Sequence, residues 1–441
     1  MIYLRVAQNI AEGSGWSFNS GDIFNAATSP IHAIFLASLL TVGLPPVDAL
    51  WLFYAAALIA GSIPLHIGLH KSHPIASFAA PLLIILWPIV QNAIGLETAT
   101  MLALLTFTSL AFRNEWLLGA GLLAGMVALT RPEGILMGPI LIFAAILFRK
   151  NWAPLLLGWT GVIAAWFAFS WYQFGSLFPH TATIKSLQSE VPPWSGGGPW
   201  HLAFLQSLPA ISILFILAAF AIWRGAIRRS PDDLFITVLL VFGFAQIVGY
   251  SVLGAPVGYW WYFAPGGIAI IVAASVGLDE IRHALAANQN NVAQRLSLIV
   301  PLVALASIAL PFATGADRPL GQPYRLSKEY TLASNWIREN SAENAVVAAN
   351  EIGYIGYFSE RPIRDMLGLL HEEAVGPLSA REWHWWLATM PDFIIVHEPR
   401  WVGEPGSSSN PWSADALSAF DQSYAPVYEV GGLRVFKLAS E

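Results

Sequence analysis

The sequence predicts a polytopic α-helical membrane domain of about ten spans, with added interfacial helices, followed by a C-terminal α/β domain. Hydrophobic residues make up 56% of the 441 residues and charged residues only 11%, with a mean hydropathy of +0.57. Ordinary soluble chains are far less apolar. Apolar runs of span length recur as far as about residue 312, and the composition beyond them is that of a soluble domain. We therefore expect domains at 1–313 and 314–441.

The candidate spans follow one another through the first domain. Residues 30–44 form a further apolar stretch, but roughly 15 residues fall short of the ~20 that a span needs. We expect 30–44 to be an interfacial or re-entrant helix. The expected spans are 48–69, 75–94, 97–112, 116–131, 134–148, 153–174, 203–223, 234–253, 259–277 and 295–313.

Basic residues predict the orientation. If 30–44 does not cross, nine Lys and Arg fall in connections on one side of the membrane domain, and only Arg5, Arg131 and Lys185 fall on the other. The positive-inside rule makes the first side cytoplasmic. We therefore expect a multi-pass protein of the inner (plasma) membrane. Its two long loops, 1–47 and 175–202, and its C-terminal domain are predicted to be extracytoplasmic.

The first loop is predicted to contain membrane-parallel helices. Arg5 and Asn9 share one helical face with Gln8 and Glu12, while Ile2, Val6 and Ile10 share another. Gly13 and Gly15 end this helix, because glycine tolerates the positive φ of a helix C-cap. The turn-rich segment that follows carries Asp22.

The amino-acid composition excludes several classes of function. A net charge of −6 and a pI near 5.9 leave no basic patch for nucleic acid. The chain has no cysteine, which excludes disulfides, thiolate metal sites and cysteine nucleophiles. The ten histidines show no metal-binding spacing, so no metal site is predicted. An octahedral divalent cation held by Asp or Glu oxygens stays compatible with the sequence.

Sparse ionisable residues beside apolar spans are candidates for a functional site, because burying them is costly. Glu97, in G-L-E-T, is either a carboxylate favoured by a helix N-terminus or part of a cavity wall. Arg131 and Glu133 frame T-R-P-E-G. They form either a structural ion pair between two spans or a site in which the forked donors of Arg131 bind a phosphate.

Two further segments carry candidate residues. The loop segment F-G-S-L-F-P-H-T-A-T-I-K presents His180, Thr181 and Lys185. Lys185 is either solvated or a phosphate ligand, and His180 is suited to proton transfer near neutral pH. The segment G-Y-W-W-Y-F-A-P, with Trp260 and Tyr262, is either an interfacial belt or a wall that faces sugar or lipid.

The C-terminal domain is predicted to mix helices and strands. Residues 330–339 have a helical pattern, 345–349 and 393–397 resemble strands, and 427–430 and 433–437 form a hairpin around Gly431–Gly432. The run W-H-W-W at 383–386 either stacks on a saccharide, lies at the membrane interface or packs in a core.

The order of these motifs resembles that of GT-C glycosyltransferases. The motifs are Y-L-R-x-A-x-N-x-A-x-G-x-G with T-S-P behind it, G-L-E-T, T-R-P-E-G, F-G-S-L-F-P-H-T-x-x-x-K, N-E-I-G-Y-I-G-Y-F and D-M-L-G-L. Within that superfamily the chain is similar to bacterial arabinofuranosyltransferases of the mycobacterial envelope and, more distantly, to protein O-mannosyltransferases. The resemblance also assigns Asp365 and Gly368 to a recurrent motif of the second domain.

The resemblance implies a transferase that moves a sugar from a polyprenyl-phosphate donor to a cell-envelope glycan, lipid or protein acceptor. Its expected partners are membrane lipids and the lipid-linked sugar. The donor phosphate is expected near Arg131 and Lys185. The substrate cavity is expected to include Arg5, Asn9, Glu97, Glu133, His180, Thr181, Trp260 and Tyr262.

One departure from the family pattern concerns the catalytic base. In such proteins a span and an acidic pair, roughly D-D-A, precede the residues that match Ile2–Leu4, and this chain starts at Met1. We therefore expect an N-terminally truncated form whose catalytic Asp lies upstream of Met1. Asp22 and Glu97 are the candidate substitutes within the chain.

The alternative is a membrane transporter or a lipid-sugar-binding protein without catalysis. A transporter should show repeated halves and charges at mid-membrane. Here the charges lie at span ends and a soluble domain follows.

Overall fold

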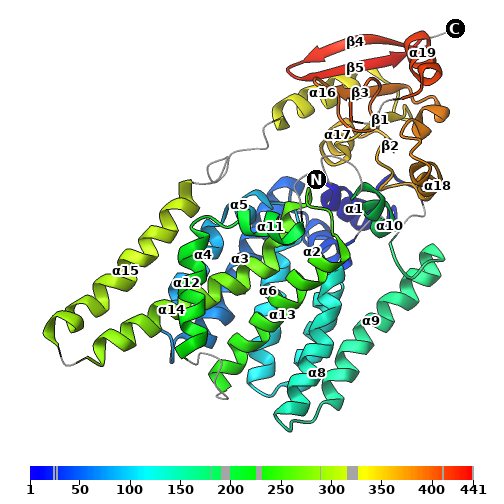
Figure 1. Cartoon of the computed structure of the whole chain (residues 1–441). Helices are drawn as coiled ribbons and strands as arrows, with labels where there is room; N and C mark the ends of the chain where they lie inside the picture. The colour runs from blue at the N-terminus through cyan, green and yellow to red at the C-terminus, as the bar shows by residue number, and fades with distance from the viewer. Residues whose placement is uncertain are drawn as a thin grey trace. The chain divides into compact units, whose positions relative to one another are not determined.

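The chain divides into two compact units in the computed structural model (Figure 1). We call Leu50–Trp166 with Gly197–Gly321 the membrane unit. We call Met1–Ala49 with Phe167–Gly196 and Gln322–Glu441 the sheet unit. The structure describes residues 1–22, 25, 28–179, 181–189, 199–224, 231–288, 290–314, 326–409 and 412–439.

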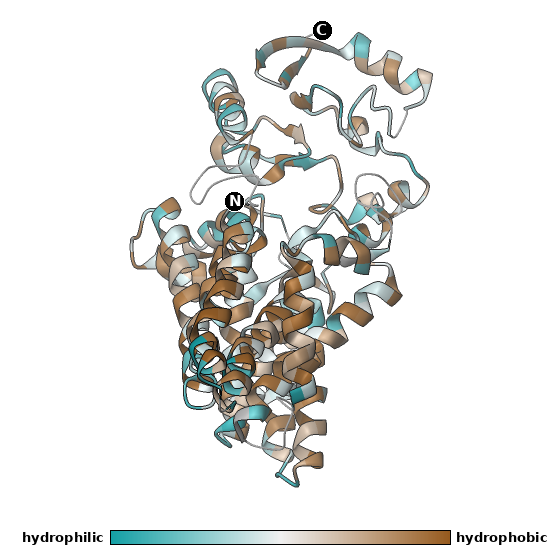
Figure 2. Ribbon diagram, turned by 60° about the vertical axis from the view of Figure 1, so that its left-hand side comes forward, coloured by the Kyte–Doolittle hydropathy of each residue, from teal (hydrophilic) through white to brown (hydrophobic). Residues whose placement is uncertain are grey.

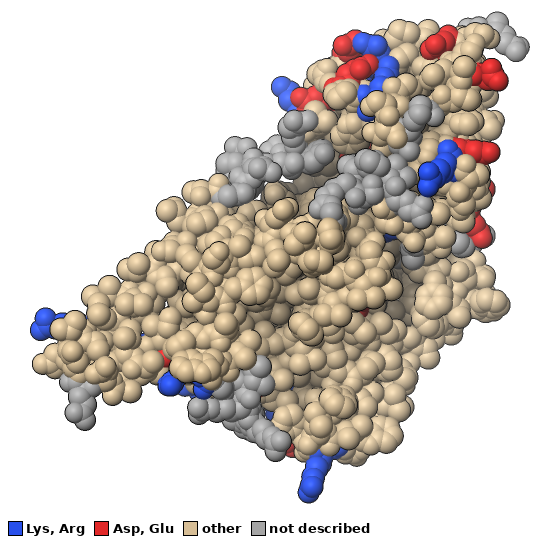
Figure 3. Space-filling view, in the orientation of Figure 1, with Lys and Arg blue, Asp and Glu red and all other residues tan. Residues whose placement is uncertain are grey.

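The membrane unit consists of helices, which are mostly apolar in Figure 2 and carry few charges on the face shown in Figure 3. Prolines interrupt several of them: Pro88 follows the end of α4, and Pro132 follows the turn after α7. The helices that contribute to this unit are α3 (Pro46–Leu69), α4 (Ala76–Leu86), α5 (Pro88–Asn92), α6 (Thr98–Arg113), α7 (Leu117–Ala128), η1 (Pro132–Leu136), α8 (Met137–Leu147), α9 (Ala153–Phe174), α11 (Trp200–Gln206), α12 (Ile211–Arg224), α13 (Pro231–Leu253), η2 (Trp260–Phe263), α14 (Ala264–Ala286) and α15 (Asn291–Thr314).

Five helical segments among the described residues are long and apolar enough to cross a membrane: Pro46–Leu69, Ala153–Phe174, Asp233–Leu253, Trp260–Ala286 and Asn291–Thr314. The pair α11–α12 becomes a sixth if it is counted as one span bent by 101°. The other four expected spans coincide with shorter apolar helices of 10–17 residues. The chain thus has the helices of a multi-pass membrane protein, and the total of about ten spans stays a prediction.

The first loop contains the two helices that the sequence predicts. Helix α1 (Ile2–Ala11) packs against α2 (Pro30–Thr41). The 12 residues of α2 reach about 18 Å, which is too short for a membrane crossing. The buried face of α1 is Tyr3, Leu4, Val6 and Ala7, not the predicted stripe Ile2, Val6 and Ile10, because α1 contacts both α2 and α17 (Ile352–Ser359).

The rest of the sheet unit surrounds a five-stranded sheet of order β2-β1-β3-β5-β4. Strand β1 is parallel to β2 and β3, while β5 is antiparallel to β3 and β4. The predicted helix, two strands and hairpin are present as α16, β1, β3 and β4–β5, whereas β2 and α17 were not predicted. The elements are α10 (Thr181–Gln188), α16 (Ser327–Asn340), β1 (Val347–Ala349), β2 (Ile363–Asp365), η3 (Glu372–Ala374), α18 (Val375–Ser379), η4 (Trp385–Thr389), β3 (Phe393–His397), α19 (Ala414–Ser423), β4 (Tyr424–Val430) and β5 (Leu433–Leu438).

A buried amide from the first loop covers the edge of this sheet. The side chain of Asn19 donates to the carbonyl of Ile363 at 3.0 Å and accepts from its N–H at 2.8 Å. Both polar groups of this edge-strand residue are thus paired. Phe18 lies so close to α17 that a Cβ on Gly356 would be 2.8 Å from its ring. These contacts explain why residues 1–49 belong to the same compact unit as the sheet.

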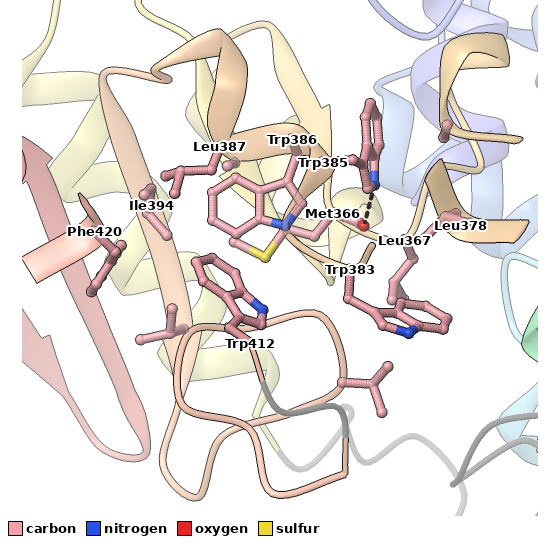
Figure 4. Packing of buried hydrophobic residues seen from close by; sticks show 14 of the residues in the cluster. Met366, Leu367, Leu378, Trp383, Trp385, Trp386, Leu387, Ile394, Trp412 and Phe420 are labelled. Atoms are coloured by element: carbon pink, nitrogen blue, oxygen red, sulfur yellow. Dashed lines mark hydrogen bonds between the residues drawn. The ribbon is translucent and has the colours of Figure 1, made fainter. Parts of the chain in front are cut away.

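The W-H-W-W run is part of a hydrophobic core (Figure 4). Trp383, Trp385 and Trp386 are buried, and the indole N–H groups of Trp385 and Trp386 donate to the carbonyls of Met366 and Gly403. The packing alternative therefore holds for this run, because no indole face is left for a saccharide to stack on.

The motif D-M-L-G-L forms a turn after β2. The carboxylate of Asp365 accepts from the N–H of Leu367 at 2.9 Å, and the N–H of Asp365 donates to Nε2 of His371 at 3.2 Å. Gly368 has φ +80°, which favours glycine, and a Cβ there would be 2.5 Å from Cβ of Ala374. Burial raises the pKa of Asp365 to about 7, and burial also lowers the pKa of His371 to about 4.

The first prediction concerns Asn19. Asn19→Ala leaves both backbone groups of Ile363 unpaired, so the free energy of unfolding should fall by about 1–3 kcal/mol. Thermal unfolding of the full chain in detergent would measure this change. Asn340→Ala is the matched control, because that side chain is exposed, and it should change stability by less than about 0.5 kcal/mol. Equal effects of the two substitutions would contradict the role assigned to Asn19.

The second prediction concerns pH. Asp365 holds its proton up to about pH 7 in the folded chain, so its contribution to stability is lost as the pH rises from about 4 to 7. His371 resists protonation down to about pH 4, so its contribution is lost as the pH falls from about 6.5 to 4. The two contributions oppose one another.

Single substitutions should therefore give opposite dependences of the thermal unfolding midpoint on pH. In Asp365→Asn, which keeps the acceptor for Leu367, the unfolding midpoint should rise with pH between about 4 and 6.5. In His371→Gln it should fall as the pH rises from about 4 to 7. Wild-type pH profiles for both variants would contradict the assignment.

Candidate functional site

Arg131 is the most enclosed Lys or Arg of the membrane unit among the described residues. Its side chain is 1% exposed and lies in the turn between α7 and η1. Nε donates to Glu133 at 2.6 Å, Nη1 donates to the carbonyl of Trp261 at 3.0 Å, and the Tyr262 ring lies 4.5 Å from the guanidinium carbon. A buried guanidinium destabilises the folded state unless its donors are paired in this way.

The local sequence explains how the turn places Arg131. Pro132 cannot continue the hydrogen bonding of α7 and begins η1 instead. Gly134 then packs directly against the carbonyl of Val127, where a Cβ would clash. T-R-P-E-G is therefore a chain reversal that directs the side chains of Arg131 and Glu133 toward the interior of the membrane unit.

Two carboxylates and a phenol complete the cluster. Glu97, the residue before α6, lies 3.6 Å from Nη1 of Arg131, and its own side chain makes no helix-cap hydrogen bond. Tyr250, on α13, donates its hydroxyl to the second oxygen of Glu133 at 2.5 Å. The four side chains come from the residue before α6, the α7–η1 turn, η1 and α13, so the cluster joins segments far apart in the sequence.

The charge balance bears on phosphate binding. Two carboxylates face one guanidinium, so Nε and Nη1 of Arg131 are already occupied by oxygen partners. Nη2 is buried and has no hydrogen-bond partner among the residues that the structure describes. An anion at this cluster would contact Nη2 alone and would be repelled by the uncompensated carboxylate. The structural ion pair is therefore present, and a phosphate role for Arg131 stays a prediction.

The aromatic segment η2 depends on the same cluster. Gln246, one helical turn before Tyr250 on α13, donates to the carbonyl of Tyr262 at 2.7 Å. Arg131 binds the adjacent carbonyl of Trp261. Tyr262 is buried and Trp260 is half-buried, so Trp260 is the better placed of the two for contact with a substrate or lipid.

The two candidate residues on α1, Arg5 and Asn9, donate hydrogen bonds to backbone carbonyls. Arg5 donates to the carbonyls of Phe18 and Arg361, each at 2.9 Å, and burial lowers its pKa to about 10. Asn9 donates to the carbonyls of Ser17 and Phe18. Both side chains hold the loop in shape, and their expected place in a substrate cavity stays a prediction.

The remaining candidates lie in the sheet unit or outside the described residues. Asp22 is exposed and accepts a hydrogen bond from Asn19 at 2.9 Å. Lys185 is half-buried on α10, and Thr181, at the start of that helix, is buried. His180 lies outside the described residues. Because Arg131 belongs to the membrane unit and Lys185 to the sheet unit, a phosphate site shared by them stays a prediction.

Sequence reasoning missed Tyr250 and Gln246. The two lie four residues apart on α13, within a helix that is otherwise almost wholly apolar. Polar residues at this spacing on a membrane span occupy one face, and that signal could have identified them. Among the described residues, no group of three or more His, Asp or Glu side chains is arranged to hold a metal ion.

Comparison with known families gives a match in the second domain. Residues 322–436 match a family described as a domain of unknown function, DUF8728. No curated protein sequence matches the chain.

Solved structures match across nearly the whole chain. ArnT from Cupriavidus metallidurans, bound to undecaprenyl phosphate, has a TM-score of 0.63 at 12% identity, over 98% of this chain and 92% of that one. The apo oligosaccharyltransferase of Archaeoglobus fulgidus has a TM-score of 0.57 at 13% identity, over 90% of this chain. The arabinofuranosyltransferase AftD from mycobacteria has a TM-score of 0.52 at 14% identity, over 100% of this chain and 38% of that one.

The chain spans 65% of the length of the archaeal oligosaccharyltransferase. Identities of 12–14% are too low to carry over an activity, but the three alignments each extend over at least nine tenths of this chain. The chain has the fold of the GT-C glycosyltransferases.

Proposed function

We propose that the chain is a glycosyltransferase that takes a sugar from a polyprenyl-phosphate-linked donor and transfers it to a cell-envelope glycan, lipid or protein. The observation that carries the proposal is the GT-C fold over nearly the whole chain, combined with a buried charged cluster in an otherwise apolar membrane unit. Costly buried charges in such a unit favour a functional site.

The nature of the donor follows from the ligands of the similar proteins. One of them is described in complex with a dolichol-phosphate and another bound to undecaprenyl phosphate. A long-chain polyprenyl phosphate is the carrier that a multi-pass membrane protein can bind from within the bilayer. We propose Lys185 as the cation that binds the donor phosphate.

The chemistry requires a base and a leaving group. A base removes the proton from the acceptor hydroxyl as that oxygen attacks the anomeric carbon, and the lipid phosphate leaves with the bonding electrons. Asp22 and Glu97 are the candidate bases within the chain. Asp22 is exposed, whereas Glu97 is 3% exposed and lies beside Arg131, so Asp22 is the more accessible of the two.

We also propose an inner-membrane location of a bacterial cell, with the sheet unit outside the cytoplasm. The support is the distribution of Lys and Arg between the two sets of connections. This orientation would present the sheet unit to envelope acceptors.

The third prediction separates the roles of the two cations. Lys185→Gln should weaken binding of undecaprenyl phosphate by about 10- to 150-fold, because one charged hydrogen bond contributes about 1.5–3 kcal/mol. Thermal unfolding should be unchanged, since Lys185 is only half-buried. Titration of the purified full chain in nanodiscs would measure the affinity.

Arg131→Gln should act differently. It leaves Glu97 and Glu133 as buried carboxylates without a cation, so it should destabilise the chain by about 3–5 kcal/mol. Tyr250→Phe serves as the milder control, because it removes one hydrogen bond to Glu133 and keeps the charges. If Arg131→Gln folds normally and loses only lipid binding, Arg131 is a phosphate ligand and the structural account is wrong.

The fourth prediction tests the orientation. The chain has no cysteine, so single cysteines can be labelled without background. Cysteine at Ser14 or Ser408 should react with an impermeant maleimide applied to intact cells, and cysteine at Ser72 should react only after lysis. Labelling of the Ser72 variant from outside would reverse the proposed orientation.

A further inference from the structure

Helix α10, which carries Lys185, is anchored by the face formed by Ile184, Leu187 and Gln188. Ile184 is fully buried in the hydrophobic cluster of the sheet unit, and Leu187 packs against the same cluster. Gln188 is also fully buried, and its amide donates to the carbonyl of Leu367 at 3.3 Å. Ile184, Leu187 and Gln188 are spaced i, i+3 and i+4, so they form one face of the helix.

The surface that receives this face is the D-M-L-G-L turn together with α18. Helix α10 packs against α18, and Leu378 of α18 belongs to the same cluster as Ile184. At Gly368, an added Cβ would lie 2.9 Å from Leu378 Cδ1 and 3.7 Å from Ile184 Cδ1. The absence of a side chain at Gly368 therefore keeps room for Ala374 and Leu378, and Ile184 lies within van der Waals distance of the same position.

The turn itself is held rigidly. Asp365 accepts from the N–H of Leu367, and the indole of Trp385 donates to the carbonyl of Met366 at 3.1 Å. The next carbonyl along the chain, that of Leu367, accepts the hydrogen bond from Gln188. The position of α10 is thus determined by a turn of the second domain, over 170 residues further along the chain.

We propose that the D-M-L-G-L turn is a seat for α10, and that Ile184 and Gln188 are positioning residues that place Lys185 for the donor phosphate. The inference rests on the proposed role of Lys185 as a phosphate ligand. Lys185 is half-buried and adjacent to Ile184, so its ammonium group moves with the helix. A charged hydrogen bond depends steeply on geometry, so a displaced helix should lose affinity for phosphate.

The chain offers a matched control for Ile184. Ile394, on β3, is also fully buried in the same hydrophobic cluster. Ile184→Ala and Ile394→Ala remove the same atoms from the same core, so they should destabilise the chain to a similar extent. Only Ile184→Ala should loosen α10, which hydrogen exchange of residues 181–189 would detect.

The test is a double-substitution cycle with undecaprenyl phosphate as the probe, titrated into the full chain in nanodiscs. Ile184→Ala should weaken binding by about 10-fold, and Ile394→Ala should change it by less than about 2-fold. In the Lys185→Gln background, Ile184→Ala should have no further effect, because the residue acts through Lys185. If Ile184→Ala does not fold, Gln188→Ala replaces it in the same cycle.

The outcomes separate the inference from the function on which it rests. If Lys185→Gln leaves binding unchanged, the phosphate role of Lys185 is wrong, and the positioning role of Ile184 and Gln188 is wrong with it. If Lys185→Gln weakens binding but neither Ile184→Ala nor Gln188→Ala does, only the seat is wrong. Equal losses from Ile184→Ala and Ile394→Ala, or additive losses in the double variant, would also overturn the inference, because both indicate a general effect on the core.

Discussion

A guanidinium that is 1% exposed among apolar helices must find partners for its donors, and the membrane unit is organised around this requirement at Arg131. The partners come from the residue before α6, from the α7–η1 turn itself and from η2. Tyr250 on α13 then binds Glu133. One buried charge thereby fixes segments as far apart in the sequence as Glu97 and Trp261, in surroundings where hydrophobic contacts alone have no preferred direction.

The same requirement restricts what the cluster can do chemically. Glu97 and Glu133 bring more negative charge than Arg131 neutralises, so the cluster is a poor host for a second anion unless another cation is present. Nη2 of Arg131 has no hydrogen-bond partner among the described residues, and this feature favours an anionic ligand. A polar cluster that is mostly satisfied internally stabilises one arrangement of helices, and this arrangement supports the aromatic segment at Trp260 through backbone carbonyls.

Several of the family-like motifs have structural roles in this chain. Arg5 and Asn9, from the first motif, bind backbone carbonyls of the loop and of the segment before β2. Gly368, from D-M-L-G-L, adopts a positive φ in a tightly packed turn. Such positions are constrained by backbone geometry, and the fold is shared with solved structures at 12–14% identity.

The sequence by itself determined the class of the protein and most of its elements. Apolar run length predicts membrane helices because the hydrocarbon core excludes unpaired backbone, and alternation with turn residues predicts β3 and the β4–β5 hairpin. Pro132 and Gly134 marked the reversal that carries Arg131. The order of motifs indicated the GT-C fold, which the solved structures confirm.

Only the tertiary structure decided which polar groups meet. Asn19 pairs with Ile363, Gln188 with Leu367 and Tyr250 with Glu133, and each pair joins residues more than a hundred positions apart. Strand β2, with three residues, is too short to leave a periodic pattern and exists because β1 and Asn19 satisfy its backbone. Hydrogen bonds of this kind depend on distances of a few ångströms between distant segments, and local sequence carries no record of those distances.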